Sequence, residues 1–363
     1  MASSGPKVWF VTGSVILLIA TMSRRLISIT SRLLSTTASR PSISTVSRPL
    51  ARVSSNITSG AKVWFVTGAS TGFGRAVTEF MLQKGDNVVA TLRKPSVLDD
   101  LAKLYPKNRL LILPLDVTVP SDITDAFVKA RETFGRVDVV FNNAGICFIG
   151  EVEGMPDGDA KHMFDTNFWG AANITKEAVA TFRDFNEPPG GHLLQMSSRT
   201  ALQVVPGVAH YAAAKAGIYI SLTFVRDATY IVAIAFESLS EGYAAELDPA
   251  WNIKITVMQP ARFRTAAPWN NVLVPIHPAY SDPNLPSRKY RSIYPGAERF
   301  SDGDINKFAL QTYRLVQLDE PPFYFPLHRT ALEAAMNKGQ KLMKAVEEYG
   351  SWSDDVYLDE EDR

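Results

Sequence analysis

Short apolar, β-branched runs alternate with longer amphipathic stretches through most of this chain, and no other feature of the sequence restricts its fold as much. The first run, Lys62 to Thr67, leads into a stretch with helical periodicity, and the same order then repeats. Strands separated by helices pair in parallel, and the crossover helices cover both faces of the sheet. The alternation therefore predicts an α/β fold, a doubly wound parallel sheet of seven strands with helices on both faces.

The predicted elements follow from the side-chain period of each stretch. The clearest strands are Lys62–Thr67, Asn87–Leu92, Arg109–Leu115, Val137–Asn142, Gly191–Met196 and Ile253–Met258, with a seventh near Phe323–Leu327. Helical patterns lie at Gly74–Gln83, Ser121–Phe134, Asp159–Phe185 and Tyr211–Leu247. The last pattern is longer than one crossover helix and its turn require.

A glycine-rich loop stands directly between the first strand and the first helix. Its residues are Thr67, Gly68, Ala69, Ser70, Thr71, Gly72, Phe73 and Gly74. The glycines let the backbone turn tightly and approach a pyrophosphate, whose charge lies at the positive end of the following helix. Glycines alone make only a turn, but this position between strand and helix predicts a dinucleotide site formed by the loop.

The end of the second strand indicates which dinucleotide is bound. An acidic residue there binds the ribose hydroxyls of NAD, whereas this chain has Arg93 and Lys94. A guanidinium suits a 2′-phosphate, so NADP(H) is favoured over NAD(H), with help from the Ser70 hydroxyl. The alternative is that both basic residues only solvate a loop. After the third strand, Asp116 and Val117 are placed to contact the adenine, although an Asp there is also a common turn residue.

The strongest local signal is Tyr211 followed four residues later by Lys215, with Ser198 upstream at the end of a strand. This spacing puts Tyr211 and Lys215 on one helical face. A phenol titrates near pH ~10, and a nearby ammonium is expected to bring the pKa of Tyr211 toward neutrality. Tyr211 would then exchange a proton with an alcohol or carbonyl oxygen that Ser198 polarises. Taken alone, the Tyr and Lys pair more often marks an amphipathic helix surface, but its combination with the glycine loop favours a catalytic pair.

Residues 61 to about 217 and 236 to 268 resemble the short-chain dehydrogenase/reductase family, because several of its motifs occur here in order. After the glycine loop come Asn142-Asn143-Ala144-Gly145 on the fourth strand, Asn167 in the central helix, and then Ser198, Tyr211 and Lys215. The resemblance implies a Rossmann fold. It also implies a catalytic tetrad of Asn167, Ser198, Tyr211 and Lys215, in which Lys215 holds the nicotinamide ribose and Asn167 maintains a water relay.

Further cofactor contacts are implied at the ends of the fourth and sixth strands. They are Asn143, Ala144 and Gly145, and, in the loop that fixes the nicotinamide, Pro260, Phe263 and Thr265. The expected function is an NADP(H)-dependent oxidoreductase that interconverts a carbonyl and an alcohol by hydride transfer. Its small-molecule substrate is expected to be apolar or aromatic, bound by Cys147, Phe148, Trp169 and the region from Arg262 to Phe300.

Two other functions stay open. One is a catalytically impaired NADP(H)-binding protein, which is disfavoured because a silent binder has no chemical reason to keep Tyr211 and Lys215 together. The other is a membrane-associated reductase that uses Ile218–Ala235 or the N-terminus as an anchor. Arg226 and Asp227 in the middle of that segment make membrane burial unfavourable.

The sequence departs from the family pattern in two places. Ala261 follows Pro260 where the family usually has glycine, and it would be strained if the position required positive φ. The chain between Lys215 and Pro260 is also longer than expected, and removal of Ile218–Ala235 restores the usual helix. That segment is either a retained untranslated sequence, which is favoured, or a genuine insertion.

Three parts are expected along the chain. Residues 1–58 form an acid-free, Arg-rich extension whose beginning, Ser4–Gly13, nearly repeats Ser59–Gly68. This extension is a transit peptide, a disordered segment or a gene-model artefact, the last being favoured. Residues 59–345 form the catalytic domain, with residues 218–235 inserted, and residues 346–363 form an acidic tail. A cytoplasmic location is expected, or a mitochondrial one if residues 1–58 are a transit peptide.

Composition limits the partners. The mildly acidic body lacks a basic stripe for nucleic acid, and five scattered His with one Cys give no metal-binding pattern. Cys147 is alone, so no disulfide framework exists, which fits a reducing compartment. A homo-oligomer is expected only by analogy with the family.

Overall fold

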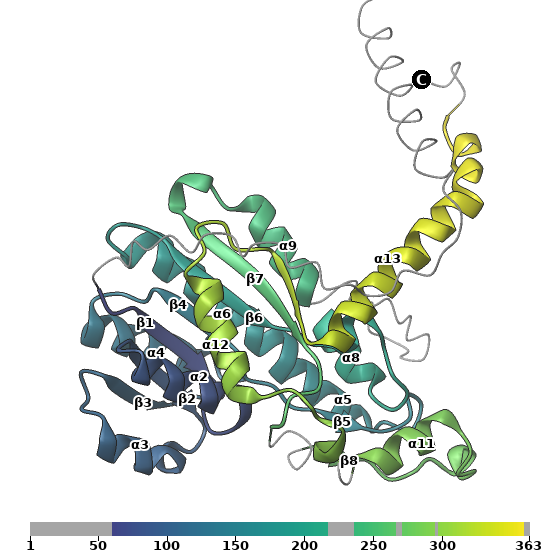
Figure 1. Cartoon of the computed structure of the whole chain (residues 1–363), viewed down its shortest axis with the longest axis horizontal. Coiled ribbons are helices and arrows are strands. Elements are labelled where there is room, and N and C mark those ends of the chain that lie inside the picture. The colour runs from purple at the N-terminus through teal and green to yellow at the C-terminus, as the bar shows by residue number, and fades with distance from the viewer. Residues whose placement is uncertain (1–59, 217–235, 266–270, 295–296, 359–363) are drawn as a thin grey trace, which may run out of the picture. The chain divides into compact units, whose positions relative to one another are not determined.

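The computed structural model describes residues 60–216, 236–265, 271–294 and 297–358. Seven parallel strands form one sheet in the order β3-β2-β1-β4-β6-β7-β9 (Figure 1). Their bounds are β1 Val63–Thr67, β2 Asn87–Leu92, β3 Leu110–Pro114, β4 Val139–Asn142, β6 Gly191–Met196, β7 Ile253–Pro260 and β9 Tyr324–Leu327. Because the strand order runs outward from β1 in both directions, the prediction of a doubly wound parallel sheet is confirmed.

Two strand boundaries differ from the prediction by two residues, for reasons of hydrogen bonding. The fourth strand starts at Val139 rather than Val137, because the Asn186 side chain takes up both backbone groups of Val137. The sixth predicted strand, β7, continues to Pro260 because its last residues pair with β9. Side-chain partners far along the chain thus set the exact ends of these strands.

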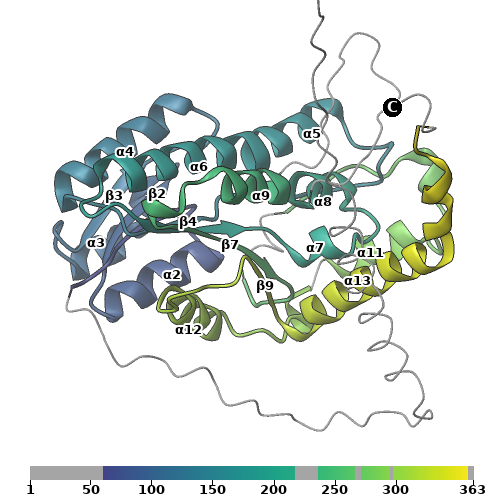
Figure 2. The same cartoon turned by 90° about the horizontal axis from the view of Figure 1, so that it is seen from above.

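Helices cover both faces of the sheet, and each face has its own core (Figure 2). On one side α2 Gly72–Gln83, α3 Asp99–Leu104 and α12 Ile305–Val316 pack around buried residues such as Trp64. On the other side α4 Pro120–Phe134, α6 Ala171–Ala180 and α9 Phe236–Glu246 pack around Phe65 and Phe127, whose rings stack 4.1 Å apart. Trp64 and Phe65 are successive residues of β1. Their side chains therefore lie on opposite faces of the sheet and pack into different cores.

The long central helix expected at Asp159–Phe185 consists of four consecutive segments. They are α5 Asp157–Phe164, the π-helical segment η2 Asp165–Gly170, α6 and the π-helical segment η3 Thr181–Phe185. A π-helical turn widens the helix and shifts the side chains that follow. The position of Asn167 within η2 therefore depends on this turn.

The pattern at Tyr211–Leu247 contains α8 Ala209–Ala216 and α9. The predicted insertion Ile218–Ala235 lies outside the described residues, as does the extension at residues 1–58. In both views α8 and α9 lie end to end (Figure 1, Figure 2), and the two helices are in contact.

Other elements were not anticipated from the sequence. Strands β5 Phe148–Ile149 and β8 Val272–Leu273 pair in parallel as a small second sheet, near α11 Pro286–Ile293. The remaining helices are α7 Arg199–Leu202, α13 Arg329–Tyr349 and the short 3-10 segments Pro95–Leu98, Pro249–Trp251, Pro278–Tyr280, Ala297–Phe300 and Gly350–Asp355. Among the described residues, no helix combines the length and apolarity needed to cross a membrane.

Candidate active site

Ser198 lies just after the end of β6, and Tyr211 lies in the first turn of α8. Ser198 has extended backbone and caps α7, with its Oγ accepting a hydrogen bond from Thr200 N at 3.1 Å. The Thr200 hydroxyl lies 3.0 Å from the same Oγ. The Tyr211 hydroxyl is hydrogen-bonded to Ser198. The two predicted catalytic hydroxyls are therefore brought together, and the cap fixes the position of Ser198.

Lys215 is almost completely buried one turn after Tyr211. Its side chain is 4% exposed, and its Nζ donates a hydrogen bond to the Met196 carbonyl at 2.7 Å. The same Nζ lies 5.4 Å from the centre of the Phe236 ring. Burial lowers the pKa of Lys215 to about 8. Lys215 is thus able to hold or release a proton close to neutral pH.

The expectation that Lys215 lowers the pKa of Tyr211 is wrong for this structure. Burial raises the pKa of Tyr211, and the charge of Cys147 acts in the same direction. The hydrogen bond with Ser198 lowers this pKa but does not offset the burial, and Lys215 is not among the groups that shift it. The physical reason is that a buried phenol loses the hydration that stabilises phenolate, while the Lys215 ammonium is engaged by Met196.

Asn167 is fully buried in the π-helical segment η2. Its Oδ1 accepts a hydrogen bond from Ile146 N at 2.9 Å, and its Nδ2 donates to the Ile146 carbonyl at 2.8 Å. A Cβ atom at Gly145 would stand 2.9 Å from Asn167 Oδ1 and 3.5 Å from Lys215 Nζ. Gly145 therefore lies beside both Asn167 and Lys215, and a larger side chain there would have to displace the Asn167 amide.

The glycine loop has the geometry that a phosphate cradle requires. A Cβ atom at Gly74 would stand 2.2 Å from the Gly68 carbonyl oxygen, so the loop closes on itself only with glycine at this position. Gly72, with φ +58, begins α2, and its N-cap residue Thr71 makes no side-chain cap. Backbone N–H groups at such a helix start suit a pyrophosphate. These residues fit a dinucleotide.

Thr67 and Asn143, two predicted cofactor contacts, also join the glycine loop to β4. Thr67 Oγ1 accepts hydrogen bonds from the backbone N–H groups of Asn143 and Ala144 at 2.8 and 3.0 Å. Asn143 Nδ2 in turn donates to the Thr67 carbonyl at 2.9 Å. These bonds give both side chains a structural role in holding the loop, whatever contact they make with a cofactor.

The predicted adenine and 2′-phosphate positions are adjacent. Hydrogen bonds from Thr118 and the charge of Arg93 lower the pKa of Asp116 against the opposing effect of partial burial. Arg93 is exposed at the end of β2, and Ser70 is partly buried in the glycine loop. Asp116 and Arg93 therefore lie within electrostatic reach of each other at the carboxyl edge of the sheet.

The loop after β7 carries no backbone strain at Ala261. Among the described residues, Asn252 and His328 are the non-glycine positions with positive φ, and Ala261 is not one of them. Ala261 N donates to the Leu327 carbonyl at 3.3 Å, so pairing with β9 keeps the backbone in an ordinary conformation. The possible strain at this position is thus excluded.

Phe263 and Thr265 of the same loop face the glycine loop. The rings of Phe263 and Phe73 are 5.5 Å apart, and Phe263 also packs against Phe308. The Thr265 Cβ lies 3.7 Å from where a Cβ on Gly72 would stand. The predicted cofactor contacts in the glycine loop and in the loop after β7 therefore lie next to each other.

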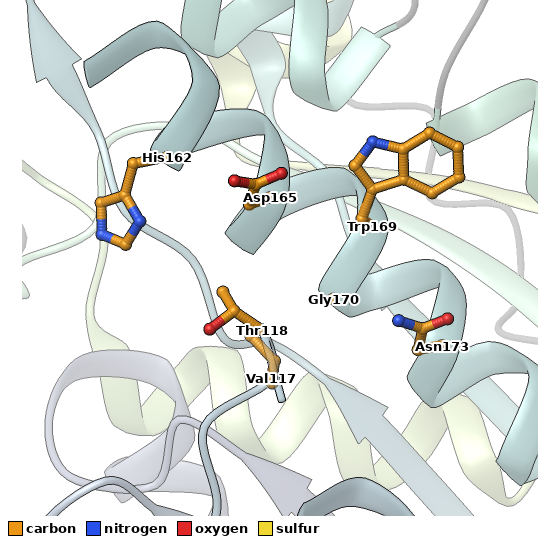
Figure 3. Close-up of a pocket in the computed structure, with 7 residues that line it drawn as sticks. All are labelled: Val117, Thr118, His162, Asp165, Trp169, Gly170 and Asn173. Carbon is orange, nitrogen blue, oxygen red and sulfur yellow. The ribbon is translucent and has the colours of Figure 1, made fainter. Parts of the chain in front are cut away.

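Cys147 lies within electrostatic reach of Tyr211, the predicted catalytic tyrosine, whereas Trp169 lies elsewhere. Burial raises the pKa of Cys147 to about 12, and this residue interacts electrostatically with Tyr211. Trp169 instead lines a separate pocket of about 420 Å³ (Figure 3). Its other lining residues are Val117, Thr118, His162, Asp165, Gly170 and Asn173. No tetrad residue belongs to this lining, so the expectation that Trp169 binds substrate is not supported.

Glu237 is a buried residue of the site region that the sequence reasoning missed. Its Oε1 accepts hydrogen bonds from Ser197 Oγ at 2.6 Å and Gln259 Nε2 at 2.8 Å. Ser197 Oγ also lies 3.2 Å from the Lys215 carbonyl. Burial raises the pKa of Glu237 despite these hydrogen bonds. This network joins β6, α8, α9 and β7 next to Ser198, and only the fold brings its members together.

The sequence and the fold of this chain are similar to those of known oxidoreductases. A family model described as short chain dehydrogenase matches residues 62–228. An uncharacterised oxidoreductase of Schizosaccharomyces pombe is 33% identical over 298 residues, which cover 82% of this chain and 92% of that protein. Oxidoreductase calM of Penicillium decumbens is 31% identical over 291 residues, 78% of this chain and 89% of that protein.

A solved structure shares the same architecture over nearly its whole length. It is a short-chain dehydrogenase from Streptomyces avermitilis, with a TM-score of 0.69 and 28% identity, covering 82% of this chain and 99% of that chain. Another neighbour, a short chain dehydrogenase/reductase from Burkholderia phymatum in complex with NAD, has a TM-score of 0.63 at 21% identity and confirms the fold. The chain therefore belongs to the short-chain dehydrogenase family and is an oxidoreductase with a Rossmann-type NAD(P)-binding domain.

Proposed function

We propose that the protein is an NADP(H)-dependent oxidoreductase that interconverts a small carbonyl compound and its alcohol, with Asn167, Ser198, Tyr211 and Lys215 as its catalytic residues. The observation that carries the proposal is the hydrogen-bonded pair of Ser198 and Tyr211. Lys215 is buried one turn away, and Gly145 separates it from Asn167. A catalytically silent binder would not need this arrangement of buried polar groups, which is costly to maintain.

A nicotinamide cofactor supplies or accepts the hydride when it is bound. In reduction, Ser198 Oγ and Tyr211 Oη hydrogen-bond the carbonyl oxygen. As the hydride reaches the carbonyl carbon, the Tyr211 proton moves to that oxygen, so that C=O becomes CH–OH and Tyr211 is left as phenolate. Lys215, with a pKa of about 8, carries a proton at neutral pH and is the nearby source for reprotonating Tyr211.

The raised pKa of Tyr211 keeps the phenol protonated at neutral pH, which is the form that donates a proton in carbonyl reduction. A phenol with a raised pKa is still more acidic than an alcohol, so it readily protonates a developing alkoxide. The same shift makes phenolate scarce, and phenolate is the base that alcohol oxidation would require.

Preference for NADP(H) rests on Arg93. Its side chain is exposed at the end of β2 and forms no ion pair with another described residue. Arg93 influences Asp116 electrostatically without forming a close ion pair, so its guanidinium is available for a 2′-phosphate. The test is a titration of the purified protein with NADPH and NADH, followed by fluorescence of the reduced nicotinamide. Tighter binding of NADPH supports the proposal, and equal or tighter binding of NADH contradicts the preference.

We also propose that the chain forms a homo-oligomer through α13. The outer part of this helix exposes Leu342, Met343, Val346 and Tyr349, each more than half exposed. Exposed apolar patches of this kind mark interaction surfaces. The helix is basic at Lys338, Lys341 and Lys344 and acidic at Glu347 and Glu348. An antiparallel second copy would place the acidic end of one α13 beside the basic stretch of the other.

Finally, we propose that residues 218–235 are dispensable for the fold. The end-to-end placement of α8 and α9 supports this, because one uninterrupted helix would occupy the same space (Figure 2).

A further inference from the structure

Two arginines from distant segments lie close together beside the catalytic serine. Arg199 directly follows Ser198 and begins α7, whereas Arg262 lies in the loop after β7. Arg199 is partly buried, and Arg262 is exposed. Burial lowers the pKa of Arg199, and the like charge of Arg262 acts in the same direction. The backbone brings the two segments together, because β6 and β7 are paired strands and Ser197 N donates a hydrogen bond to the Met258 carbonyl at 2.9 Å.

Neither arginine has an acidic partner among the residues that the structure describes. The ion pairs of the described arginines involve Arg75, Arg136, Arg183, Arg291 and Arg329. The hydrogen bond of Arg199 goes to Gln203 Oε1 at 3.4 Å, which is long for a guanidinium bond. A partly buried cation beside a second cation is unfavourable unless an anion is present.

Two tyrosines connect this pair with the catalytic phenol. Tyr290 in α11 and Tyr294 just after it have rings 5.3 Å apart and share a hydrogen bond. Arg199 interacts electrostatically with both tyrosines. Tyr294 interacts in turn with Tyr211 and Cys147. Tyr294 therefore lies within electrostatic reach of both Tyr211 and Arg199.

The helix that carries Tyr290 is held firmly in place. Arg291 donates hydrogen bonds to the Val274 carbonyl and, from Nη1, to the Ile149 carbonyl at 3.4 Å. It also forms an ion pair with Glu151 at 3.4 Å, and the Glu151 side chain is 1% exposed. Because this buried pair joins α11 to the small β5–β8 sheet, the position of the tyrosines relative to Tyr211 is fixed by the fold rather than by a loose loop.

We propose that Arg199 and Arg262 bind an anionic group of the substrate, at the end of the molecule opposite the reacting carbonyl. The substrate would then be an organic carboxylate or phosphate whose apolar or aromatic body lies against Tyr294 and Cys147. A pair of guanidinium groups recognises the oxygens of either anion, and their own repulsion is relieved when the anion binds. The carbonyl end of this substrate rests on the proposed function, whereas the anion site does not depend on it.

The competing occupant is a phosphate of the cofactor. Thr265, three residues after Arg262, faces Gly72 of the glycine loop, so the loop reaches the cofactor side there. Arg262 is instead coupled to Arg199 on α7, beside the substrate hydroxyls. The experiment must therefore measure substrate and cofactor binding separately.

The experiment measures binding of matched ketones to the full chain saturated with NADP⁺, by calorimetry, so that no turnover occurs. The probes are para-acetylbenzoate and para-acetylphenylpropionate, each with its methyl ester, and para-acetylphenyl phosphate with para-methoxyacetophenone as its neutral partner. At least one anion should bind about tenfold more tightly than its neutral partner, and added salt should reduce the ratio. The phosphate arm shows which of the two anions is preferred.

Variants assign the preference to the arginine pair. Arg199→Gln and Arg262→Gln should each bring the ratio close to one, and Arg199→Lys should give an intermediate ratio. Lys289→Gln removes an exposed charge from α11 and should leave the ratio unchanged. Circular dichroism and the affinity for NADP⁺ check that each variant is folded.

The proposal is overturned if no anion binds more tightly than its neutral partner, if none of the probes binds, or if Arg199→Gln weakens NADP⁺ instead. Turnover of the same ketones with NADPH is then measured separately. Reduction of the neutral ketones without an anion preference would retain the proposed function and exclude the anion site. An anion preference without turnover would exclude the proposed reaction and retain the site.

Discussion

Tyr211 and Lys215 share one helical turn, and burial shifts their pKa values in opposite directions. It raises the pKa of Tyr211 and lowers that of Lys215 to about 8. Both shifts have one cause, since a low-dielectric environment disfavours the charged form of each group. At neutral pH the pair therefore consists of a neutral phenol and a largely protonated lysine, which suits proton donation to an alkoxide.

The first residue-scale prediction concerns the Tyr211 hydroxyl. Tyr211→Phe removes the proton donor while preserving the ring, so kcat for carbonyl reduction should fall by about two to four orders of magnitude. The dissociation constant for NADPH should stay within about twofold, because the glycine loop is untouched. Steady-state kinetics and nicotinamide fluorescence measure the two effects. Tyr243→Phe, on α9, is the matched control, and equal activity of both variants would exclude Tyr211 as the acid.

Arg93 is expected to determine the preference for NADPH over NADH. Arg93→Ala should weaken NADPH binding by about tenfold, or ~1.4 kcal/mol, because it removes a charge-assisted contact with the 2′-phosphate. NADH binding should not change. Lys107→Ala is the control, since Lys107 is exposed just before β3, at the edge of the sheet opposite the cofactor. A parallel loss of NADPH and NADH affinity in Arg93→Ala would indicate a structural role instead.

At the scale of elements, contacts with other parts of the chain set the position of the helix segments that carry the site residues. Asn167 is held by both backbone groups of Ile146, and the helix accommodates it with the π-helical segment η2. Helices α8 and α9 also pack against each other. Helix α8 carries Tyr211 and Lys215, and α9 carries the buried Phe236 and Glu237. Both arrangements place a helix segment so that its polar side chains reach the site.

A variant lacking residues 218–235 tests whether α8 and α9 form one functional helix. We expect it to bind NADPH as the full chain does and to unfold at the same or a higher temperature, because a shorter connection costs less conformational entropy. Thermal unfolding and nicotinamide fluorescence measure this. Loss of folding in this variant would show that the segment contributes to the structure.

The exposed face of α13 leads to a prediction about assembly. Leu342→Glu combined with Val346→Glu should shift the protein to monomer, because charges would be buried in the proposed contact. Sedimentation velocity measures the mass. Gln340→Glu adds one negative charge elsewhere on the helix and should not change the mass. If the unsubstituted chain is already a monomer at micromolar concentration, the proposed α13 contact is wrong.

For the whole molecule, pH acts on stability through a buried histidine. Burial, with the charges of Lys254 and Lys62, lowers the pKa of His192 to about 3, and His192 lies 3.0 Å from Thr256 Oγ1. Unfolded histidine titrates near its ordinary pKa of 6.5. Between these values the unfolded chain binds a proton that the folded chain does not, so stability falls as the pH decreases through this window.

His192→Gln should therefore reduce the acid sensitivity of the fold. Between about pH 7.5 and about pH 4.5, His192 contributes roughly 2.5 kcal/mol to the decrease in the free energy of unfolding. The variant should lose less stability over this range than the original chain, by about that amount. Urea unfolding at several pH values measures the difference. Identical pH dependence in the two proteins would show that folding does not shift the pKa of His192.

The sequence by itself determined the features that depend on neighbouring residues. Strand β6 has the predicted bounds Gly191–Met196, because its apolar run and the flanking turn residues define it locally. The glycine loop and the spacing of Tyr211 and Lys215 are likewise local patterns, and they identified the fold and the family. The same local view missed β5, β8 and α11, which are too short or too polar to give a clear period.

Only the tertiary structure decided the features that depend on residues far apart in the chain. Burial by the whole domain raises the pKa of Tyr211, although the local spacing to Lys215 suggested the opposite. Pairing with Leu327 gives Ala261 an ordinary backbone, and the fold brings Arg199 beside Arg262. Desolvation and long-range pairing arise from the folded chain as a whole, so no local pattern predicts them.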